Sequence, residues 1–382
     1  MSHTQCPLPW VSLEVSATGG IKPCCLVEAP VAQVGSSSFV DAAGTEAMAQ
    51  IRKQMLAGER PAACVKCWEA EDAGHISKRQ QAIKKYGLPT AQQFKFLDLK
   101  LGNICNIKCR ICGDTSSSQW ATETYQHTGG RKRYLIIAEG GRWPRETPLF
   151  WSEIEAHLQT VEELEITGGE PLLIQEQFTV LKRAVELGVS DRIAIHYNTN
   201  GTVFPEDAIT NIWPHFKQVE LAFSIDNVGD RFEYERYPAN WNAVKENVNR
   251  LNRLRLSERW LQTQICCTVS KFNIYYLPEI TEFITTVRPK TWYYNLLHSH
   301  EMFNISYFAL PVKLAIKSRL EEKMSHLPFY TEKVAPIINF MMVNNEPNDQ
   351  QFLARVAQVD GWRKQKLNDT HPELYALLNE KT

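Results

Sequence analysis

Three cysteines, Cys105, Cys109 and Cys112, fall within eight residues of the chain, in the spacing C-x3-C-x2-C. A cubane [4Fe–4S] cluster normally takes four thiolates, one for each iron. A loop that supplies three thiolates leaves one iron able to bind a small molecule through nitrogen and oxygen. A zinc knuckle or three unrelated buried thiols are the alternatives, and so close a spacing argues against coincidence. The motif therefore predicts a reactive iron–sulfur site.

A second group of cysteines lies near the start of the chain and comprises Cys6, Cys24, Cys25, Cys64 and Cys67. Cys64 and Cys67 form a C-x2-C pair. Four of these thiols could ligate every iron of a second cubane, which would leave no open iron. The same four ligands would also satisfy a structural zinc ion. The residues by themselves leave open both the metal and the choice between Cys24 and Cys25.

A strand predicted over 96–101 leads directly into the three-cysteine loop. Further apolar runs predict strands, and amphipathic patterns such as the one over 241–254 predict helices between them. Six β/α repeats imply a parallel sheet with right-handed crossovers. The predicted fold class is therefore α/β, with a partial (β/α)6 TIM-like barrel as the simplest closure. The further strands are expected at 161–167, 192–197, 219–225, 262–269 and 291–297.

The regions on either side of the predicted barrel have their own patterns. Residues 1–88 predict a small domain made of a β-hairpin and a helix, and residues 301–382 predict a helical extension. The expected domains are therefore 1–88, 89–300 and 301–382. The glycine-containing insertion at 129–148 predicts a loop. The hairpin strands are expected at 10–15 and 21–26, and the helices at 45–56, 311–324 and 350–363.

Unusual residues follow the predicted strands at their carboxyl ends, where β/α architectures place reactive groups. The second strand ends in Gly168, Gly169, Glu170 and Pro171. Glycines there allow a ligand to approach the backbone closely, and the neighbouring carboxylate can bind an ammonium group. The next strand ends carry Asn200, Ser224 and Asp226. Turn formation is the alternative role of these residues, because Asn and Asp favour turns.

The loop and the strand ends together resemble the signature of the radical SAM superfamily. The resemblance implies that Cys105, Cys109 and Cys112 hold a [4Fe–4S] cluster whose open iron chelates S-adenosylmethionine. It also implies that the segment Gly168–Pro171 holds the methionyl amino group of that cofactor. By the same resemblance, the other expected cofactor contacts are Asn200, Ser224, Asp226 and Ile111. The residue at the position of Ile111 is often aromatic in the superfamily, so this chain departs from the pattern there.

The first cysteine group resembles the twitch domain, a short relative of the SPASM module that carries one auxiliary [4Fe–4S] cluster. In that family a Gly-x4-Cys step supplies a ligand, and Gly19 to Cys24 matches it. The resemblance implies that Cys6, Cys24, Cys64 and Cys67 ligate the auxiliary cluster. Twitch and SPASM modules usually follow the barrel, whereas this one precedes it.

The resemblance implies an enzyme that reductively cleaves S-adenosylmethionine and removes a hydrogen atom from its substrate with the 5′-deoxyadenosyl radical. Flavodoxin or ferredoxin would supply the electron. A ribosomal peptide or protein side chain, modified by crosslinking, epimerisation or oxidation, is the expected substrate. The alternatives are oxidation or epimerisation of a small alcohol or aminosugar, and a non-catalytic iron–sulfur protein. Tyr294 and Cys267 are candidate catalytic residues, with aromatic packing and an inert buried thiol as their alternative roles.

The composition is that of an ordinary globular chain of 382 residues, 43% hydrophobic and 22% charged, with a formal net charge of -1. This balance gives no reason to expect nucleic acid or an anionic membrane as a partner. No apolar run approaches the ~18 residues that cross a bilayer, and the first residues lack the pattern of a signal peptide. Eight of the ten cysteines fall in the two groups with metal-ligand spacing. A reducing cytoplasm is therefore the expected compartment.

Overall fold

The computed structural model describes residues 4–72, 76–89, 91–298 and 300–379. The fold is mixed α/β, and the chain divides into two compact units. Unit 1 comprises Met1–Asn106, Asp114–Asn198 and Pro205–Glu220, and unit 2 comprises Ile107–Gly113, Thr199–Phe204 and Leu221–Thr382. The three domains expected from the sequence, 1–88, 89–300 and 301–382, remain a prediction, and their outer bounds at Met1 and Thr382 lie outside the described residues.

The sheet of unit 1 is built around β4, the strand that leads into the three-cysteine loop. β4 pairs in parallel with β1 and with β5, and β5 pairs in parallel with β6. β1 turns back into β2, which pairs with β3, and both of these pairings are antiparallel. The predicted hairpin is thus confirmed, and it extends the same sheet as β4. The bounds are β1 (Ser12–Val15), β2 (Gly20–Lys22), β3 (Ala32–Gln33), β4 (Phe96–Lys100), β5 (Glu163–Thr167) and β6 (Ala194–Thr199).

One face of this sheet supplies the core of unit 1. Leu97, Leu164 and Ile195 stand in register on β4, β5 and β6, and each is at most 1% exposed. Because side chains alternate across a strand, the residues between them point to the opposite face. The long helices of unit 1 are α3 (Glu46–Leu56), α5 (Lys78–Tyr86), α6 (Ser118–Thr128), α9 (Pro148–Leu158) and α10 (Gln175–Glu186), and the shorter ones are α1 (Leu8–Val11), α2 (Phe39–Gly44), α4 (Val65–Asp72) and α11 (Glu206–Asn211).

The insertion predicted as a loop at 129–148 is instead helical, so this prediction was wrong. It forms α7 (Arg131–Gly140) and α8 (Trp143–Glu146). Its glycines act at helix ends: Gly129 has φ +70° and caps the carboxyl end of α6, and Gly141 follows the last residue of α7. Pro144 sits in the first turn of α8, where its missing N–H costs nothing. Glycine and proline residues therefore mark the ends and starts of successive short helices here, and not a loop.

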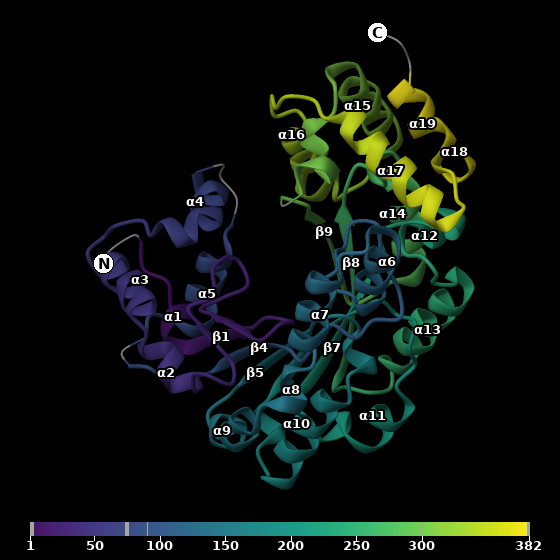
Figure 1. The fold of residues 1–382 in the computed structure, drawn as a ribbon. Helices are drawn as coiled ribbons and strands as arrows, with labels where there is room; N and C mark the ends of the chain where they lie inside the picture. The colour runs from purple at the N-terminus through teal and green to yellow at the C-terminus, as the bar shows by residue number, and fades with distance from the viewer. Residues whose placement is uncertain (1–3, 73–75, 90, 299, 380–382) are drawn as a thin grey trace. The chain divides into compact units, whose positions relative to one another are not determined.

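Unit 2 contains β8, β9, the end of β7 from Leu221 on, and a set of helices. β8 (Leu261–Val269) pairs in parallel with β9 (Thr291–Leu296), and β7 (Gln218–Ser224) precedes them in the strand order. Helix α18 contacts both α12 and α17. Helices α17, α18 and α19 at the carboxyl-terminal end of the chain are drawn in yellow (Figure 1). The helices are α12 (Gly229–Glu235), α13 (Trp241–Leu254), α14 (Leu277–Val287), α15 (Leu310–Met324), α16 (Ala335–Met341), α17 (Asp349–Arg363), α18 (Leu367–Thr370) and α19 (Pro372–Asn379).

The long, strongly patterned helices agree with the sequence predictions. The helices predicted at 45–56, 311–324 and 350–363 correspond to α3, α15 and α17 with ends that differ by one residue, and the helix predicted at 241–254 is α13. The partial (β/α)6 barrel remains a prediction. No helix in the described part of the chain is long and apolar enough to span a membrane.

Candidate functional site

Four of the five N-terminal cysteines line one cavity in unit 1: Cys6, Cys24, Cys64 and Cys67. The rest of its lining is mainly apolar and includes Leu8, Val27 and Met55. Burial raises the pKa of all four thiols, and in the case of Cys64 the pKa reaches about 12. Each of Cys6 and Cys64 also lies close enough to the other thiols for their charges to raise its pKa further. The structure thus gathers the predicted ligands around a common space.

Short elements position these thiols. Cys6 precedes α1, Cys24 follows β2, and Cys64 ends a 3-10 turn that runs into α4, which carries Cys67. The apolar core beneath them includes Leu8, Ile51, Met55, Ala82 and Phe96. Trp68 follows Cys67 and donates from its indole nitrogen to the carbonyl of Pro61 at 3.1 Å. The cavity is therefore held by hydrophobic packing around the hairpin and helices α3 to α5.

Cys25 has a different environment from its neighbour Cys24. Its sulfur accepts a hydrogen bond from Lys78 Nζ at 3.0 Å, and it is not among the residues that line the cavity. Burial raises the pKa of the Cys25 thiol to about 11, although the charge of Lys78 opposes this rise. Of the two adjacent thiols, Cys24 is therefore the one that shares a space with Cys6, Cys64 and Cys67.

The chemistry of this donor set fits a thiolate-ligated group. In the described part of the chain, no three His, Cys, Asp or Glu side chains are arranged as the shell of one metal ion. A cubane places each thiolate on a different iron, so its ligands surround a space rather than converge on a point. Four cysteines around an apolar cavity have that arrangement.

The first part of the three-cysteine loop contacts the Gly-Gly-Glu-Pro segment within unit 1. Glu170 N donates to Ile104 O at 2.8 Å, directly before Cys105. A Cβ atom on Gly169 would lie 2.2 Å from that same carbonyl oxygen, so only glycine permits the approach. Gly168 has φ +125°, a conformation that side chains rarely adopt. Two motifs more than 60 residues apart in the sequence therefore meet through backbone atoms.

Glu170 itself is 0% exposed, and its Oε1 accepts from the N–H of Leu172 at 3.1 Å. Cys105 N donates to Ser118 Oγ at 3.2 Å, which ties the loop to the start of α6. Pro171 opens a 3-10 turn, Pro171–Leu173, and is also buried. The strand end after β5 thus carries a buried carboxylate on a residue whose backbone contacts Ile104, the residue before the first loop cysteine.

The rest of the loop belongs to unit 2, which contains Cys109 and Cys112. A hydrogen bond with Cys112 lowers the pKa of the Cys109 thiol to about 7, against the effect of burial, and the charge of Arg236 adds to the lowering. Arg236 Nη1 lies 3.7 Å from Cys109 Sγ. Cys112 is exposed, whereas Cys109 is 7% exposed. The surroundings of this loop therefore favour a thiolate at Cys109.

The remaining predicted cofactor residues of unit 2 have partners of their own. Asn200 is buried, and its Oδ1 accepts from the backbone N–H of Thr202 at 2.9 Å, which is the geometry of a turn. Ser224 and Ile111 are half-buried. Asp226 is 2% exposed and forms an ion pair with Arg236 at 2.6 Å. Their contact with a cofactor remains a prediction.

The two candidate catalytic residues both lie in unit 2, where Cys267 is buried and Tyr294 is half-buried. Cys267 is 0% exposed, and burial raises the pKa of its thiol well above the usual value. The Tyr294 hydroxyl shares a hydrogen bond with Thr281 Oγ1, and burial raises the pKa of Tyr294. These surroundings fit the packing roles that the sequence analysis left open, and the catalytic roles remain untested.

A row of ionisable side chains crosses the second face of the unit 1 sheet, and the sequence analysis missed it. Glu14, Asp98, Glu165 and His196 stand in register on β1, β4, β5 and β6. Burial and the charge of Glu165 raise the pKa of Asp98 to about 7. His196 Nδ1 lies 2.9 Å from Glu220 Oε2. Each strand shows one ionisable residue between apolar ones, but only the register reveals the row.

Two arginines beside the loop were also missed. Arg236 reaches Cys109, and Arg110, inside the loop, reaches Asp360 on α17 at 2.5 Å. The partners lie 127 and 250 residues apart in the sequence. Nothing in the local sequence around either arginine signals these contacts.

Comparison with known proteins gives no family assignment. Neither a protein-family model nor a curated protein matches the chain. A structure of native anSMEcpe with bound AdoMet matches with a TM-score of 0.37 and 15% identity, over 53% of this chain and 50% of that chain. A structure of Streptococcus suis SuiB bound to S-adenosylmethionine matches with a TM-score of 0.39 and 13% identity, over 77% and 61% of the two chains.

A structure of TYW1 with a lysine–pyruvate adduct bound gives a TM-score of 0.31 and 12% identity, over 60% of this chain and 71% of that chain. The chain spans about half the length of anSMEcpe and less than two thirds of SuiB. At these TM-scores the matches carry no argument about this chain. Its function is therefore argued from its own residues.

Proposed function

We propose that this chain is a radical SAM enzyme. The observation that carries the proposal is the backbone contact between the Gly-Gly-Glu-Pro segment and Ile104, the residue before the first loop cysteine. In the proposed function these two segments must act on one ligand, because the loop binds the iron and the second segment binds the amino group of the cofactor.

In this proposal Cys105, Cys109 and Cys112 would hold a [4Fe–4S] cluster, and its open iron would take S-adenosylmethionine. When bound, the cluster and the cofactor would supply a 5′-deoxyadenosyl radical that removes a hydrogen atom from the substrate. Glu170 would accept hydrogen bonds from the methionyl ammonium, beside the backbone of Gly168 and Gly169. The further contacts proposed for the cofactor are Asn200, Ser224, Asp226 and Ile111.

The chain's own contribution would be to orient the ligands and to exclude water. Glu170 is 0% exposed, so its carboxylate would meet an ammonium group in a site of low dielectric constant, where ion pairs are strong. Cys109 is 7% exposed, and its two neighbours, Lys108 and Arg110, donate backbone hydrogen bonds to Tyr237 and Glu235. Burial of this kind protects a reactive radical from solvent and oxygen.

The cavity of Cys6, Cys24, Cys64 and Cys67 would hold an auxiliary [4Fe–4S] cluster with every iron ligated. Such a site would structure the N-terminal region or relay electrons, and it would not bind the cofactor or substrate directly. Hydrophobic packing around the cavity supports a resident group there. We propose that this region is a twitch-like domain and that it precedes the radical SAM portion of the chain.

We propose a ribosomal peptide or a protein side chain as the substrate, with flavodoxin or ferredoxin as the electron donor and the cytoplasm as the compartment. This choice rests on the resemblance of the cysteine group to twitch and SPASM modules, which often act on peptides. A small alcohol or aminosugar is the competing substrate class. Mass spectrometry of the peptide and small-molecule fractions after co-expression with neighbouring genes would distinguish the two, because each predicts a mass shift in a different fraction.

The first experiment is anaerobic reconstitution of the full chain, followed by incubation with dithionite and S-adenosylmethionine. We expect about eight irons per chain, two cubanes' worth, and slow formation of 5′-deoxyadenosine without substrate. The triple variant Cys105→Ala, Cys109→Ala, Cys112→Ala should keep about four irons and form no product. A wild-type protein that holds a reduced cluster on the loop and yields no 5′-deoxyadenosine would refute the proposal and favour a non-catalytic iron–sulfur protein.

A further inference from the structure

The guanidinium of Arg236 lies against the sulfur of Cys109 in the interior of unit 2. Arg236 Nη1 donates to Cys109 Sγ at 3.7 Å, and Arg236 is 8% exposed. A hydrogen bond to sulfur is weak when the thiol is neutral and strengthens when the sulfur carries negative charge. A cysteine that ligates iron is a thiolate. The contact would therefore be strongest in the iron-bound protein.

The backbone fixes this pairing on both sides. Two hydrogen bonds of 2.7 Å flank it, from Lys108 N to Tyr237 O and from Arg110 N to Glu235 O. They bracket Cys109 in the loop and Arg236 at the carboxyl end of α12, so these two residues stand opposite each other. The backbone pairing therefore places the side chains of Cys109 and Arg236 where they can meet.

Asp226 holds the other edge of the guanidinium. Its Oδ2 accepts from Arg236 Nε at 3.0 Å and from Nη2 at 2.6 Å, and its Oδ1 accepts from the N–H of Thr268 at 2.8 Å. Arginine keeps its charge in proteins, so the guanidinium of Arg236 is positive beside the carboxylate of Asp226. Both oxygens of Asp226 are thus engaged, and this residue positions Arg236.

We propose that Arg236 donates an N–H to the cluster thiolate of Cys109 and sets the reduction potential of that cluster, with Asp226 as its counter-charge. The inference rests on the proposed function, because it requires a cluster on the loop. Reduction adds one negative charge, and a nearby cation with a hydrogen bond to sulfur favours the reduced state. Asp226 offsets part of the positive field, so the two residues should shift the potential in opposite directions.

The test is a redox titration of the reconstituted full chain, followed by EPR spectroscopy, in a Cys64→Ala, Cys67→Ala background in which only the loop carries a cluster. Arg236→Met should lower the midpoint by at least a tenfold change in the one-electron equilibrium constant, about 59 mV. Asp226→Asn should raise the midpoint, because it leaves the guanidinium unbalanced. Arg236→Lys keeps the charge without the planar fork and should fall between wild type and Arg236→Met.

Arg231→Met is the matched control. Arg231 lies in the same helix, α12, but its Nε donates to Asn227 Oδ1 at 3.2 Å and not to a thiol. Its loss should change the same equilibrium constant less than twofold. Equal shifts for Arg231→Met and Arg236→Met would overturn the inference, and so would shifts of the same sign for Arg236→Met and Asp226→Asn.

The result is separable from the test of the proposed function. A wild-type protein that forms 5′-deoxyadenosine while Arg236→Met keeps the wild-type midpoint overturns the inference alone. Opposite midpoint shifts in a protein that forms no 5′-deoxyadenosine support the inference and refute the enzyme. If the Cys64→Ala, Cys67→Ala background does not fold, both clusters are titrated together. The EPR signal of the loop cluster is then identified as the signal that is absent from the triple variant Cys105→Ala, Cys109→Ala, Cys112→Ala.

Discussion

The N-terminal cavity of unit 1 and the Cys109–Cys112 segment of unit 2 surround their thiols with different chemistry. In the cavity, burial among apolar side chains raises the pKa of Cys6, Cys24, Cys64 and Cys67. In the loop segment, a hydrogen bond with Cys112 and the charge of Arg236 lower the pKa of Cys109. The contrast supports the proposal of two clusters with different tasks, in which the cavity would enclose a fully ligated cluster and the loop would hold its cluster beside a cation.

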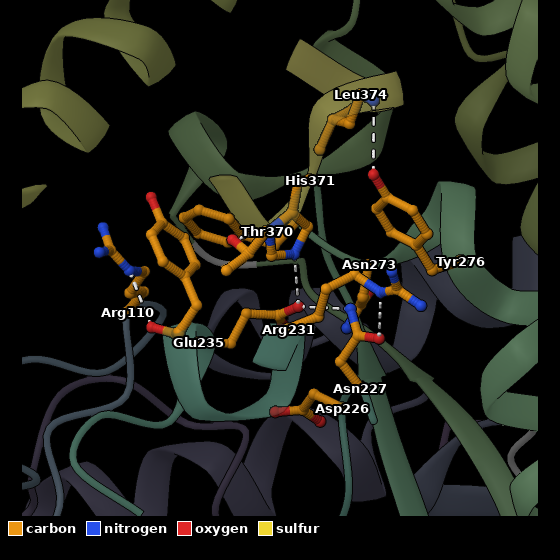
Figure 2. Close-up of polar contacts among 12 residues, drawn as sticks. Arg110, Asp226, Asn227, Arg231, Glu235, Asn273, Tyr276, Thr370, His371 and Leu374 are labelled. Carbon is orange, nitrogen blue, oxygen red and sulfur yellow. Dashed lines mark hydrogen bonds and ion pairs between the residues drawn. The ribbon is translucent and has the colours of Figure 1, made fainter. Parts of the chain in front are cut away.

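The two regions are also supported differently. Around the cavity the supports are hydrophobic, whereas behind the loop they are polar and come from the carboxyl-terminal helices. Arg110 extends from the loop and stacks 3.5 Å from the ring centre of Tyr234 while it pairs with Asp360 on α17. Figure 2 shows Arg110 together with a second group, in which His371 meets Glu235. The carboxyl-terminal helices are therefore a structural part of the loop's support.

We predict first that the two adjacent N-terminal thiols, Cys24 and Cys25, are not equivalent as cluster ligands. Cys24→Ala should lower the iron content of the reconstituted protein from about eight to about four per chain, since a cubane lacking one of four thiolates is poorly held. Cys25→Ala should keep about eight, because its sulfur is bonded to Lys78 away from the cavity. Iron analysis and EPR spectroscopy of both variants measure this. The opposite outcome would assign the ligand to Cys25.

The second prediction concerns the polar support of the loop. Asp360→Asn keeps the shape of the side chain but leaves the Arg110 guanidinium, whose side chain is 2% exposed, without its carboxylate. Uncoupling a buried pair in this way typically costs about 3 kcal/mol. The unfolding midpoint in denaturant should fall, and iron should be lost from the loop while the cavity keeps its share.

The matched control for that prediction is an ion pair on the surface of unit 1. Arg60 and Asp72 lie 2.7 Å apart, but their side chains are 51% and 58% exposed. Asp72→Asn should leave the midpoint unchanged, since exposed pairs contribute little. If Asp360→Asn released iron equally from both sites, the two regions would share one support and the comparison would fail.

The sequence carried the ligand types and most of the elements because both are local properties. The cysteine spacings are visible within a few residues, and α13 matches its amphipathic pattern over Trp241–Leu254. The insertion at 129–148 was misjudged because glycines that end helices look the same as glycines in loops. The contact of Arg236 with Cys109 joins residues 127 positions apart, and it depends on a backbone register that no local pattern encodes.

The third and smallest expected effect is a pH dependence of the polar support. His371 is 0% exposed, and burial, with the charges of Arg231 and Arg110, lowers its pKa well below the usual value. Between the lowered pKa of His371 in the folded chain and pH ~6.5, the unfolded chain binds a proton at this residue that the folded chain does not bind. The contribution of His371 to stability is therefore lost as the pH falls below about 6.5. Burial raises the pKa values of the four thiols that line the apolar cavity, so these thiols do not change charge between pH 5.5 and pH 7.5.

His371→Gln should therefore be less stable than wild type at pH 7.5, with a gap that narrows by roughly 1 kcal/mol at pH 5.5. Burial also raises the pKa of its partner Glu235. His326→Gln, which removes a histidine at an exposed position of the same unit, is the matched control. Denaturant unfolding at the two pH values measures both. A constant gap for His371→Gln would mean that the histidine stays accessible to protons in the folded state, and the loop's support would then be less enclosed than the thiol cavity.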